Sequence, residues 1–570
     1  MSTPSVWSNV DAGRSWSRIY QEQELIQPAE QARATYDVDE AVDRLRADYD
    51  ETPYNSVSYP QSAPGQLAAV SYLFGLETPD VSTARVLEIG CAAGGNLIPY
   101  AAAHPDARVV GIDLSPAHIG QGRLMVEALG LDNVELLAGD IARMDLEALG
   151  QFDFIIAHGV YSWVPAEVQD ALLSAFRKLL ATQGVAYMSY NVYPGWKSKE
   201  IARDAMLLAS GASATPEDKA RDARAMVDFL EEVTEADGVL ARVLAEFRAH
   251  SEGFGDSSLL HDELATFNAP CYFYEMVGRA GRHGLTFLAE ARPEVMFPAN
   301  FGPKVAEHLL EKCGGVQVLV EQYIDFVVNR TFRQSLLVHA ERAPQIRYNP
   351  NGSRFRRLHI AALVPPVEEQ TRLDNSRQEY RQADGSTLFT NDPGIKAALD
   401  ALSARWPWTL SRQELVDEVH VRLVSAGFNP SASLPDHIDS LMGVLILQGQ
   451  AHCRLDPVLP EGAPTPLRLD ETARRMAELT RTKIDASTFN LWHETHLLSP
   501  VDRHLLPLLD GTRDHSALVE ALLEIAREDP IPIERDGKPL SGETELRDAL
   551  VEHVDALPQR LAEMKLLRVS

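Results

Sequence analysis

Short apolar runs alternate with helical stretches between residues 85 and 190. The runs are rich in Val, Ile, Leu and Phe, and they lie at Arg85–Ile89, Arg108–Ile112, Val134–Leu137, Phe152–Ile156 and Val185–Ser189. After the second run, Ser115 and Pro116 have the pattern of a helix N-cap and a first helical residue. Strands that alternate with helices build right-handed βαβ units. The pattern therefore predicts an α/β fold with a doubly wound parallel sheet.

The rest of the chain follows other patterns and divides into further regions. Its 570 residues would make about four domains of roughly 150 residues each. Helical periodicity dominates after the sheet, and the Pro-rich stretch Pro457–Pro466 is typical of a linker. We expect five regions: a helical N-terminal lead-in at 1–80, the sheet core at 81–212, a mostly helical domain at 213–340, a hairpin and winged-helix-like domain at 341–456, and a C-terminal helical domain at 467–570.

Two local signals support the assignment of region 341–456. Asp384-Gly385 lies between β-rich flanks and predicts a tight hairpin. Ser411 and Glu414 have the spacing of a capping box, in which two side chains satisfy each other's backbone amides at a helix start. Acidic residues outnumber basic ones between residues 392 and 456, so a winged helix here is expected to contact protein rather than DNA.

The overall charge narrows the class of partner. The chain carries 53 Lys and Arg against 82 Asp and Glu, a formal net charge of −29. Nucleic-acid binding relies on cationic side chains that neutralise phosphates, so this balance argues against DNA or RNA. It favours a small molecule or a basic protein surface, although an acidic surface can equally serve solubility alone.

Other features of the sequence indicate a cytoplasmic protein. No apolar run approaches the roughly 20 residues of a membrane helix, so no membrane insertion is expected. The polar start of the chain lacks the pattern of a secretory signal. The four cysteines are far apart, which argues against a disulfide framework or a zinc ribbon; they are Cys91, Cys271, Cys313 and Cys453.

A glycine-rich turn follows the first apolar run, in the segment Glu88–Asn96. Such a turn between a strand and a helix lets a ligand approach the backbone closely. The spacing nearly fits a dinucleotide site through Gly90, Ala92 and Gly95, and it equally fits the tighter turn of methyltransferases through Gly90, Ala92 and Gly94. Glu88 favours the second interpretation, because a carboxylate attracts the ammonium and sulfonium of S-adenosylmethionine but repels the pyrophosphate of NAD.

Acidic residues also end the next two apolar runs. Asp113 can accept hydrogen bonds from a ribose diol, and Asp140 can accept one from an adenine amino group while Ile141 packs on the ring. Any one of these residues could be an ordinary solvated strand end. Their occurrence at the ends of successive strands, where such sheets bind ligands, predicts a nucleoside site.

Aromatic and amide side chains follow the fourth and fifth runs, at His158–Trp163 and Tyr190–Trp196. Aromatic rings attract a cation and pack against its methylene stem, while an amide can orient its nitrogen. The alternative is that these rings are ordinary core. On the first interpretation the candidate catalytic residues are Asn191, Tyr161 and Tyr193, and the candidate substrate-binding residues are Trp163, Trp196 and Tyr190.

Two further motifs contain residue types that are common in metal or catalytic sites. His493-Glu494-Thr495-His496 is one residue short of a HExxH zinc helix and is expected to lie on the surface. His261-Asp262-Glu263 lacks a partner cluster elsewhere in the sequence and is expected to be structural. No metal site is predicted.

The segment 84–190 resembles class I S-adenosylmethionine-dependent methyltransferases. More narrowly, the chain is similar to a bacterial subfamily with a methyltransferase regulatory domain, to which rickettsial protein-lysine methyltransferases of an outer-membrane protein belong. The motifs that carry this likeness are Pro53–Ser56, Cys91–Pro99, His158–Pro165 and Ser189–Trp196, with Phe267–Pro270 and Leu288–Ala291 in a regulatory domain at about 219–330. The segment Tyr59–Pro64 departs from the family pattern.

The resemblance implies a Rossmann-like methyltransferase core, a helical middle domain and a C-terminal winged-helix region. It implies S-adenosylmethionine as cofactor and methyl transfer to an amine, with a protein lysine as the preferred acceptor and a small-molecule amine as the alternative. An NAD-binding oxidoreductase and a non-catalytic cofactor-binding scaffold are further alternatives, and the oligomeric state is left open. The expected cofactor-binding residues are Glu88, Gly90, Cys91, Ala92, Gly94, Asn96, Asp113, Leu114, Asp140, Ile141, His158 and Gly159.

Overall fold

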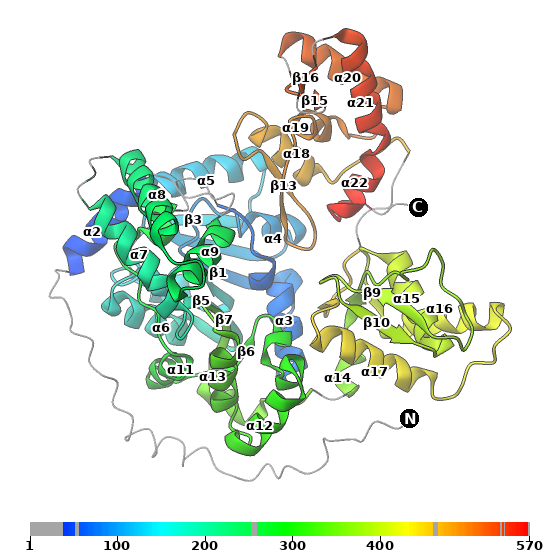
Figure 1. Ribbon diagram of the computed structural model, residues 1–570, viewed down its shortest axis with the longest axis horizontal. Coiled ribbons are helices and arrows are strands. Elements are labelled where there is room, and N and C mark those ends of the chain that lie inside the picture. The colour runs from blue at the N-terminus through cyan, green and yellow to red at the C-terminus, as the bar shows by residue number, and fades with distance from the viewer. Residues whose placement is uncertain are drawn as a thin grey trace.

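A seven-stranded sheet with the order β3-β2-β1-β4-β5-β7-β6 forms the centre of the protein (Figure 1). Strands β1 to β5 are parallel, and β7 runs antiparallel to both β5 and β6. The five runs predicted from the sequence are β1 to β5, so the doubly wound fold is confirmed. The strands are β1 (Arg85–Ile89), β2 (Arg108–Asp113), β3 (Val134–Ala138), β4 (Phe152–Ala157), β5 (Leu180–Asn191), β6 (Leu285–Glu290) and β7 (Phe332–His339).

The structure is a computed structural model, and not every residue of the chain is described in it. The expectations for residues 1–37, for the Pro53–Asn55 part of the family motif and for the middle of the Pro-rich linker lie outside the described residues. Those described are 38–51, 56–211, 213, 215–251, 259–350, 352–459, 465–529, 531–535, 538–540 and 542–567.

Helices pack against the sheet because its central strands are apolar on both faces. Four of the five residues of β1 are buried, as are five of the six in β4. Helix α5 begins as predicted, with the hydroxyl of Ser115 accepting the His118 N–H, and it ends at Gly130 in a left-handed conformation. The neighbouring helices are α3 (Pro64–Leu73), α4 (Ile98–Ala103), α5 (Pro116–Leu129), α6 (Ala166–Leu179) and α11 (Phe273–Arg282).

Two strands of the sheet come from a region expected to be mostly helical. β6 and β7 lie within 213–340, yet β7 pairs with β5 over Ala186–Asn191. The sheet therefore continues across the boundary placed at residue 212. The remainder of the region is helical, in α8 (Pro216–Val233), α9 (Val239–Ser251), α12 (Pro303–Cys313) and α13 (Gln317–Val328).

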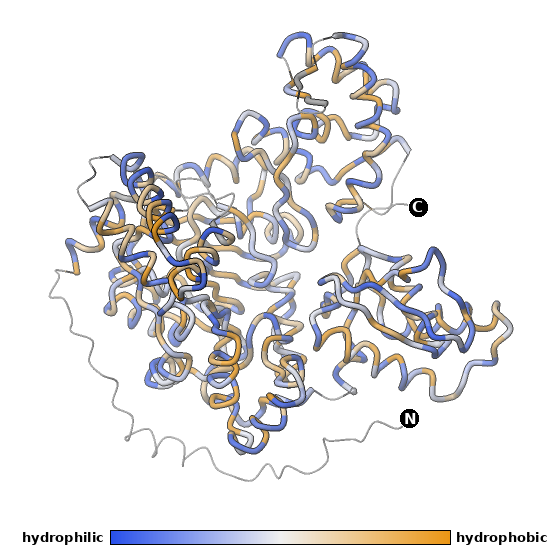
Figure 2. Tube along the Cα trace, viewed as in Figure 1, coloured by the Kyte–Doolittle hydropathy of each residue, from blue (hydrophilic) through white to orange (hydrophobic). Residues whose placement is uncertain are grey.

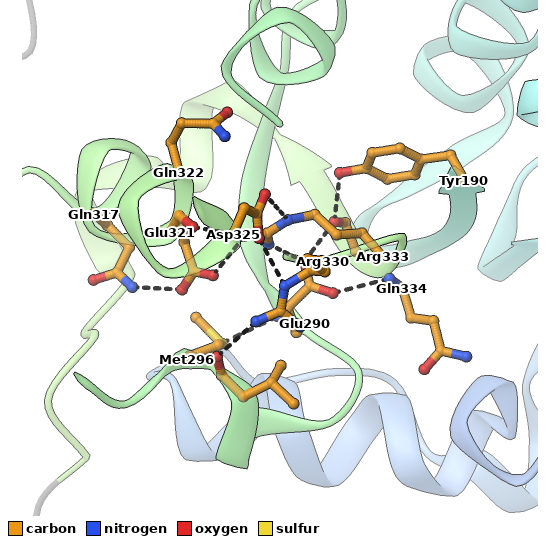
Figure 3. Close-up of polar contacts among 12 residues, drawn as sticks. Tyr190, Glu290, Met296, Gln317, Glu321, Gln322, Asp325, Arg330, Arg333 and Gln334 are labelled. Carbon is orange, nitrogen blue, oxygen red and sulfur yellow. Dashed lines mark hydrogen bonds and ion pairs between the residues drawn. The ribbon is translucent and has the colours of Figure 1, made fainter. Parts of the chain in front are cut away.

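A buried ionic cluster joins β6 and β7 to α13 (Figure 3). We call Arg330, Arg333, Glu290, Glu321 and Asp325 the Arg333 cluster. Arg333 is 1% exposed, and its guanidinium donates to Glu290 Oε1 at 2.7 Å, Asp325 Oδ1 at 2.7 Å and Glu321 Oε2 at 3.1 Å. Arg330 Nε also donates to Asp325 Oδ1, at 2.7 Å. The cluster thus places two arginine cations among carboxylates of β6 and α13.

Helices α7 (Trp196–Ser210), α8 and α9 pack on one another around a small hydrophobic core of their own. In Figure 1 they stand with α2 (Val38–Glu51) on one side of the sheet. Hydrophobic and hydrophilic residues alternate along α8 (Figure 2), as expected for a helix with a single buried face.

The described part of region 341–456 contains four α-helices and small antiparallel sheets. The predicted hairpin is confirmed as β9 and β10, with Gly385 at φ +82° in its turn. The predicted capping box of Ser411 and Glu414 is also confirmed. The elements are α14 (Gly352–Phe355), β8 (His359–Ala361), β9 (Gln378–Arg381), β10 (Thr387–Thr390), α15 (Pro393–Arg405), β11 (Leu410–Ser411), α16 (Arg412–Ser425), α17 (Leu434–Leu447) and β12 (His452–Arg454).

The last region has its own hydrophobic core and contains short strands beside its helices. Hairpin β13–β14 connects α18 to α19. Among the helices that the structure describes, none combines the length and the apolar character of a membrane span. The elements are α18 (Glu471–Thr480), β13 (Ser487–Phe489), β14 (Thr495–Leu497), α19 (Asp502–Leu505), α20 (His515–Glu528), β15 (Glu534–Arg535), β16 (Lys538–Pro539), α21 (Glu543–Asp555) and α22 (Leu557–Glu563).

Candidate active site

A cavity of about 470 Å³ lies at the carboxyl ends of the parallel strands. This is the edge at which doubly wound sheets bind their ligands. Helices α2 and α7 to α9 and a π-helical turn (Leu259–Glu263) also contribute to its wall. Eleven of the twelve residues expected to bind the cofactor line it, and Gly94 does not. The eleven are Glu88, Gly90, Cys91, Ala92, Asn96, Asp113, Leu114, Asp140, Ile141, His158 and Gly159.

The glycine-rich turn has the geometry of the tighter of the two predicted patterns. Gly90, Ala92 and Gly94 have positive φ angles of +77°, +47° and +80°, and Gly95 does not. A Cβ at Gly90 would lie 2.4 Å from Val160 Cγ2, so no larger residue fits there. The N–H of Ala92 donates to Asp113 Oδ2 at 2.8 Å. The turn therefore joins the ends of β1 and β2 at the floor of the cavity.

Glu88 lies at the end of β1 with one carboxylate oxygen unsatisfied. It is 2% exposed, and its Oε1 accepts from Asn96 Nδ2 at 2.8 Å. Its Oε2 has no hydrogen-bond partner among the residues described. Burial raises the pKa of Glu88 to about 8, against the opposing effect of the Asn96 hydrogen bond. A buried carboxylate with a free oxygen fits the ammonium group of S-adenosylmethionine.

The two aspartates predicted for the nucleoside keep acceptor capacity. Asp113 Oδ1 accepts from Ser115 N–H at 2.9 Å, so together with the Ala92 bond each of its oxygens retains a lone pair. Asp140 Oδ1 accepts from Ala142 N–H at 2.9 Å, and this bond stabilises the backbone turn after β3. Ile141 supplies an apolar wall beside Asp140. These groups fit a ribose diol and an adenine ring.

His158 follows β4 as a neutral stacked ring. It packs on Tyr59 with ring centroids 3.6 Å apart, and its Nδ1 is 2.8 Å from the hydroxyl of Tyr187. Burial lowers the pKa of His158 to about 3, so the ring carries no charge at neutral pH. The N–H of Gly159 donates to Ser189 Oγ at 2.8 Å, which fixes the loop after β4.

The residues predicted for the acceptor divide into two groups. Asn191, Trp163 and Trp196 line the cavity, and the two indole rings meet edge to face at 6.3 Å. Asn191 Nδ2 donates to Asn268 Oδ1 at 2.9 Å. Within the described part of the chain, no side chain or amide donates to Asn191 Oδ1.

Tyr161, Tyr190 and Tyr193 do not line the cavity. The hydroxyl of Tyr161 accepts from Arg279, that of Tyr190 lies 2.9 Å from Ser335 Oγ, and that of Tyr193 donates to Glu200 Oε1 at 2.7 Å. Tyr190 and Asn191 are successive residues of β5, so they point to opposite faces of the sheet. These rings therefore lie outside the cavity that Asn191, Trp163 and Trp196 line, and their expected role at the acceptor stays a prediction.

The cavity wall also contains residues that the sequence did not single out for function. Asp262 and Glu263, expected to be structural, line it together with Lys199 and Arg248. Burial and, to a smaller extent, the neighbouring Glu263 raise the pKa of Asp262 to about 6. Only the fold brings the π-helical turn to this site, so no local sequence signal could have identified it.

The position of His493 corrects the expectation that its motif lies on the surface. It was expected on the surface, but it is 5% exposed and its Nε2 lies 2.9 Å from Asn96 Oδ1. Its segment belongs to hairpin β13–β14 and not to a helix. Across the described ranges, no group of three or more His, Cys, Asp or Glu residues could hold a metal ion.

Family models match three parts of the chain. They are described as a methyltransferase domain at 86–184, a predicted methyltransferase regulatory domain at 255–339, and a PKMT C-terminal winged helix domain at 472–566. The regulatory domain model includes β6 and β7. The winged helix model matches the range that we expected to be helical, and not the range 341–456.

Relatives and solved structures agree with these matches. The protein RP789 of Rickettsia prowazekii is 33% identical over 515 residues, which span 88% of this chain and 90% of that protein. RP028 of the same organism is 35% identical over 241 residues, or 42% of this chain and 96% of that protein. PKMT2 from Rickettsia typhi, solved in complex with AdoHcy, has a TM-score of 0.79 and 26% identity, covering 91% of this chain and 100% of that one.

These matches decide between the cofactor classes that the glycine-rich turn left open. AdoHcy is the product that S-adenosylmethionine leaves after methyl transfer, and the methyltransferase domain model covers the turn and both aspartates. The NAD-dependent oxidoreductase and the non-catalytic scaffold are therefore set aside. The chain belongs to the family of RP789, and it is an S-adenosylmethionine-dependent methyltransferase with a methyltransferase regulatory domain and a C-terminal winged helix domain.

Proposed function

We propose that this enzyme methylates the side-chain amine of lysine in a protein substrate. The observation that carries the proposal is the composition of the cavity wall. Beyond the cofactor turn, the wall includes Asn191, Trp163 and Trp196 and then the carboxylates Asp262 and Glu263. Rings suit a methylene stem, and carboxylates attract a cationic amine. A lysine side chain combines both features.

We assign the cofactor contacts as the sequence predicted them. Glu88 holds the ammonium group, Asp113 the ribose diol, and Asp140 with Ile141 and Leu114 the adenine. The turn at Gly90, Cys91, Ala92 and Gly94 encloses the methionine end, supported by Asn96, His158 and Gly159. The unsatisfied Oε2 of Glu88 and the free lone pairs of Asp113 support these assignments.

The protein's own residues act mainly by positioning. S-adenosylmethionine supplies a methyl group on a sulfonium; the amine nitrogen bonds to the methyl carbon while the carbon–sulfur electron pair stays on sulfur. Asn191 Oδ1 accepts an N–H of the amine and so directs its lone pair. Trp163 and Trp196 exclude water from the stem. Such alignment can lower a barrier by roughly 7–11 kcal/mol.

The acceptor must be neutral when it reacts, because a protonated amine has no lone pair. Lysine has an ordinary pKa of about 10.4. Burial among rings beside a sulfonium lowers the pKa of the amine, so the proton leaves before transfer and no dedicated general base is required. Asp262 and Glu263 would attract the ammonium to the entrance.

The matched structure and the winged helix model add support. Both carry the label PKMT, for protein lysine methyltransferase. We further propose a cytoplasmic location, since the four cysteines are buried and free, as is usual in a reducing compartment.

The test is methyl transfer from labelled S-adenosylmethionine to a bacterial protein extract. We expect acid-precipitable label with the full-length enzyme, located on lysine nitrogen by mass spectrometry of the digested proteins. An Asn191→Ala enzyme that still binds S-adenosylhomocysteine serves as the matched control and should transfer little label. Label confined to small molecules would replace the lysine proposal with the alternative of a small amine, and label on carboxylates would refute both.

A further inference from the structure

Hairpin β13–β14 of the winged helix domain contacts the segment around Ser58, which lies next to the glycine-rich turn of the cofactor site. The N–H of Ser58 donates to Thr495 Oγ1 at 3.0 Å, and the two hydroxyls are 2.7 Å apart. The indole of Trp492 donates to the carbonyl of Pro407 at 3.1 Å. Between these anchors, His493 occupies a left-handed conformation with φ +64°. The hairpin is thus fixed on both sides of His493.

His493 contacts a side-chain amide with four well-defined partners. Asn96 Oδ1 accepts from Tyr59 N–H at 2.8 Å and from His493 Nε2 at 2.9 Å. Asn96 Nδ2 donates to Glu88 Oε1 at 2.8 Å and to Ser62 Oγ at 3.0 Å. Since both donors face the oxygen of the amide, its NH₂ group is turned toward Glu88.

The orientation of Asn96 determines which oxygen of Glu88 remains available. Asn96 satisfies Oε1, and Oε2 stays without a partner in the described structure. Burial lowers the pKa of His493 to about 3, so its ring donates as a neutral group. A neutral donor orients the amide without adding a positive charge that would repel a cationic ligand.

We propose that His493 is a positioning residue of the cofactor site, through which the winged helix domain completes the contact to the amino-acid end of the cofactor. The inference rests on the proposed role of Glu88. Without the His493 donor, the Asn96 amide loses one of the two groups that fix its direction, and its hold on Glu88 weakens. Cofactor binding and docking of the hairpin are then linked reciprocally.

The experiment compares two ligands and two variants by calorimetry on the full-length protein. S-adenosylhomocysteine has the amino-acid end, and 5′-methylthioadenosine lacks it. His493→Asn is too short to reach Asn96, whereas His493→Gln carries the same amide one methylene further. We expect His493→Asn to weaken S-adenosylhomocysteine binding about tenfold and to leave methylthioadenosine binding unchanged. His493→Gln should restore most of the affinity.

Controls separate positioning from loss of structure. His496→Asn alters the same hairpin without a contact to Asn96, and it should leave the affinity for both ligands unchanged. Equal weakening of both ligands by His493→Asn, or no weakening of either, would overturn the inference. Glu88→Gln tests the proposed function on its own. If Glu88→Gln leaves the affinity for S-adenosylhomocysteine unchanged, the proposed role of Glu88 is wrong. If Glu88→Gln weakens binding of S-adenosylhomocysteine but not of methylthioadenosine, and His493→Asn shows no such difference, only the proposed role of His493 is wrong.

Discussion

Glu88 and Glu290 are equally buried carboxylates at the ends of strands in one sheet, and their surroundings differ. Both are 2% exposed. Burial would raise the pKa of Glu290, but Arg333 and Arg330 outweigh it and hold that pKa below the usual range. Among the residues that the structure describes, no cation contacts Glu88, and burial raises its pKa to about 8. A buried carboxylate that is paired with cations of its own chain, such as Glu290, has a structural role. A buried carboxylate without such a partner, such as Glu88, is a candidate ligand-binding group.

The largest effect should follow from removing the cation of the Arg333 cluster. Arg333→Met would leave Glu290, Glu321 and Asp325 buried without their main partner. We expect it to destabilise folding by about 3–5 kcal/mol, measured by urea unfolding. Arg221→Met, at an exposed pair on α8, should change stability little. Equal losses in the two variants would contradict a structural role for the cluster, and an insoluble Arg333→Met protein beside a soluble control would support it.

Unlike Arg333→Met, Glu88→Gln should weaken cofactor binding and stabilise the ligand-free protein. It removes the charge that the cofactor ammonium would meet, so we expect S-adenosylhomocysteine affinity to fall about a hundredfold. The ligand-free protein should gain stability. The folded pKa of Glu88 is raised from 4.5 to about 8, so its contribution is greatest below pH 4.5 and is lost as the pH rises toward 8.

Thermal unfolding of wild type and Glu88→Gln across pH 5–9 measures this difference. The melting temperature of the variant should exceed that of the wild type by an amount that grows from pH 5 to about pH 8 and then levels off. Binding to the wild type should release a proton, which calorimetry in buffers of different ionisation enthalpy detects. A constant difference in melting temperature across the range would show that Glu88 is already ionised.

Asp113→Ala removes a carboxylate that serves both the fold and the site. Its oxygens accept the N–H groups of Ala92 and Ser115 and retain lone pairs for a ribose. We expect cofactor affinity to fall by roughly 1.5–3 kcal/mol, measured by titration with S-adenosylhomocysteine. Asp113→Asn keeps one acceptor oxygen and should lose less. Unaltered binding by a folded Asp113→Ala protein would remove this residue from the site.

The smallest effects distinguish two polar residues of the same segment. Asn191→Ala should lower methyl transfer at least tenfold, about 1.4 kcal/mol of barrier, with cofactor affinity intact. Tyr193→Phe serves as the matched control, because its hydroxyl contacts Glu200 outside the cavity, and it should keep nearly full activity. A larger loss of methyl transfer in Tyr193→Phe than in Asn191→Ala would indicate that Tyr193 acts at the acceptor.

The sequence could predict those parts of the molecule that local patterns determine. Strands β1 to β5 each have an apolar run beside a helix, and the turn at Gly90 to Asn96 requires small residues. β6 and β7 were missed because α7 to α9 and α11 lie between β5 and β6, and a pairing between distant strands has no local signature. The position of Tyr190 outside the cavity lining could not be predicted, because the face of a strand residue follows only from its register.

His493 and Asp262 show the same limit at the site. Each lies in a segment with an ordinary local pattern, and each reaches the cavity region only because separate domains pack together. A search for metal or catalytic motifs examines neighbours in sequence, whereas these two residues act on neighbours in space. The three tyrosines show the converse, since proximity in sequence to Asn191 or Trp163 does not bring them into the cavity lining.

The insertion of helices between β5 and β7 has a consequence for synthesis on the ribosome. β5 ends at Asn191, and its antiparallel partner is complete only at His339. At about 5–20 residues per second, the nascent chain carries β5 as an open, apolar sheet edge for roughly 7–30 s. Such an edge invites pairing with other chains. A recombinant fragment that ends at residue 212 would keep this edge exposed permanently.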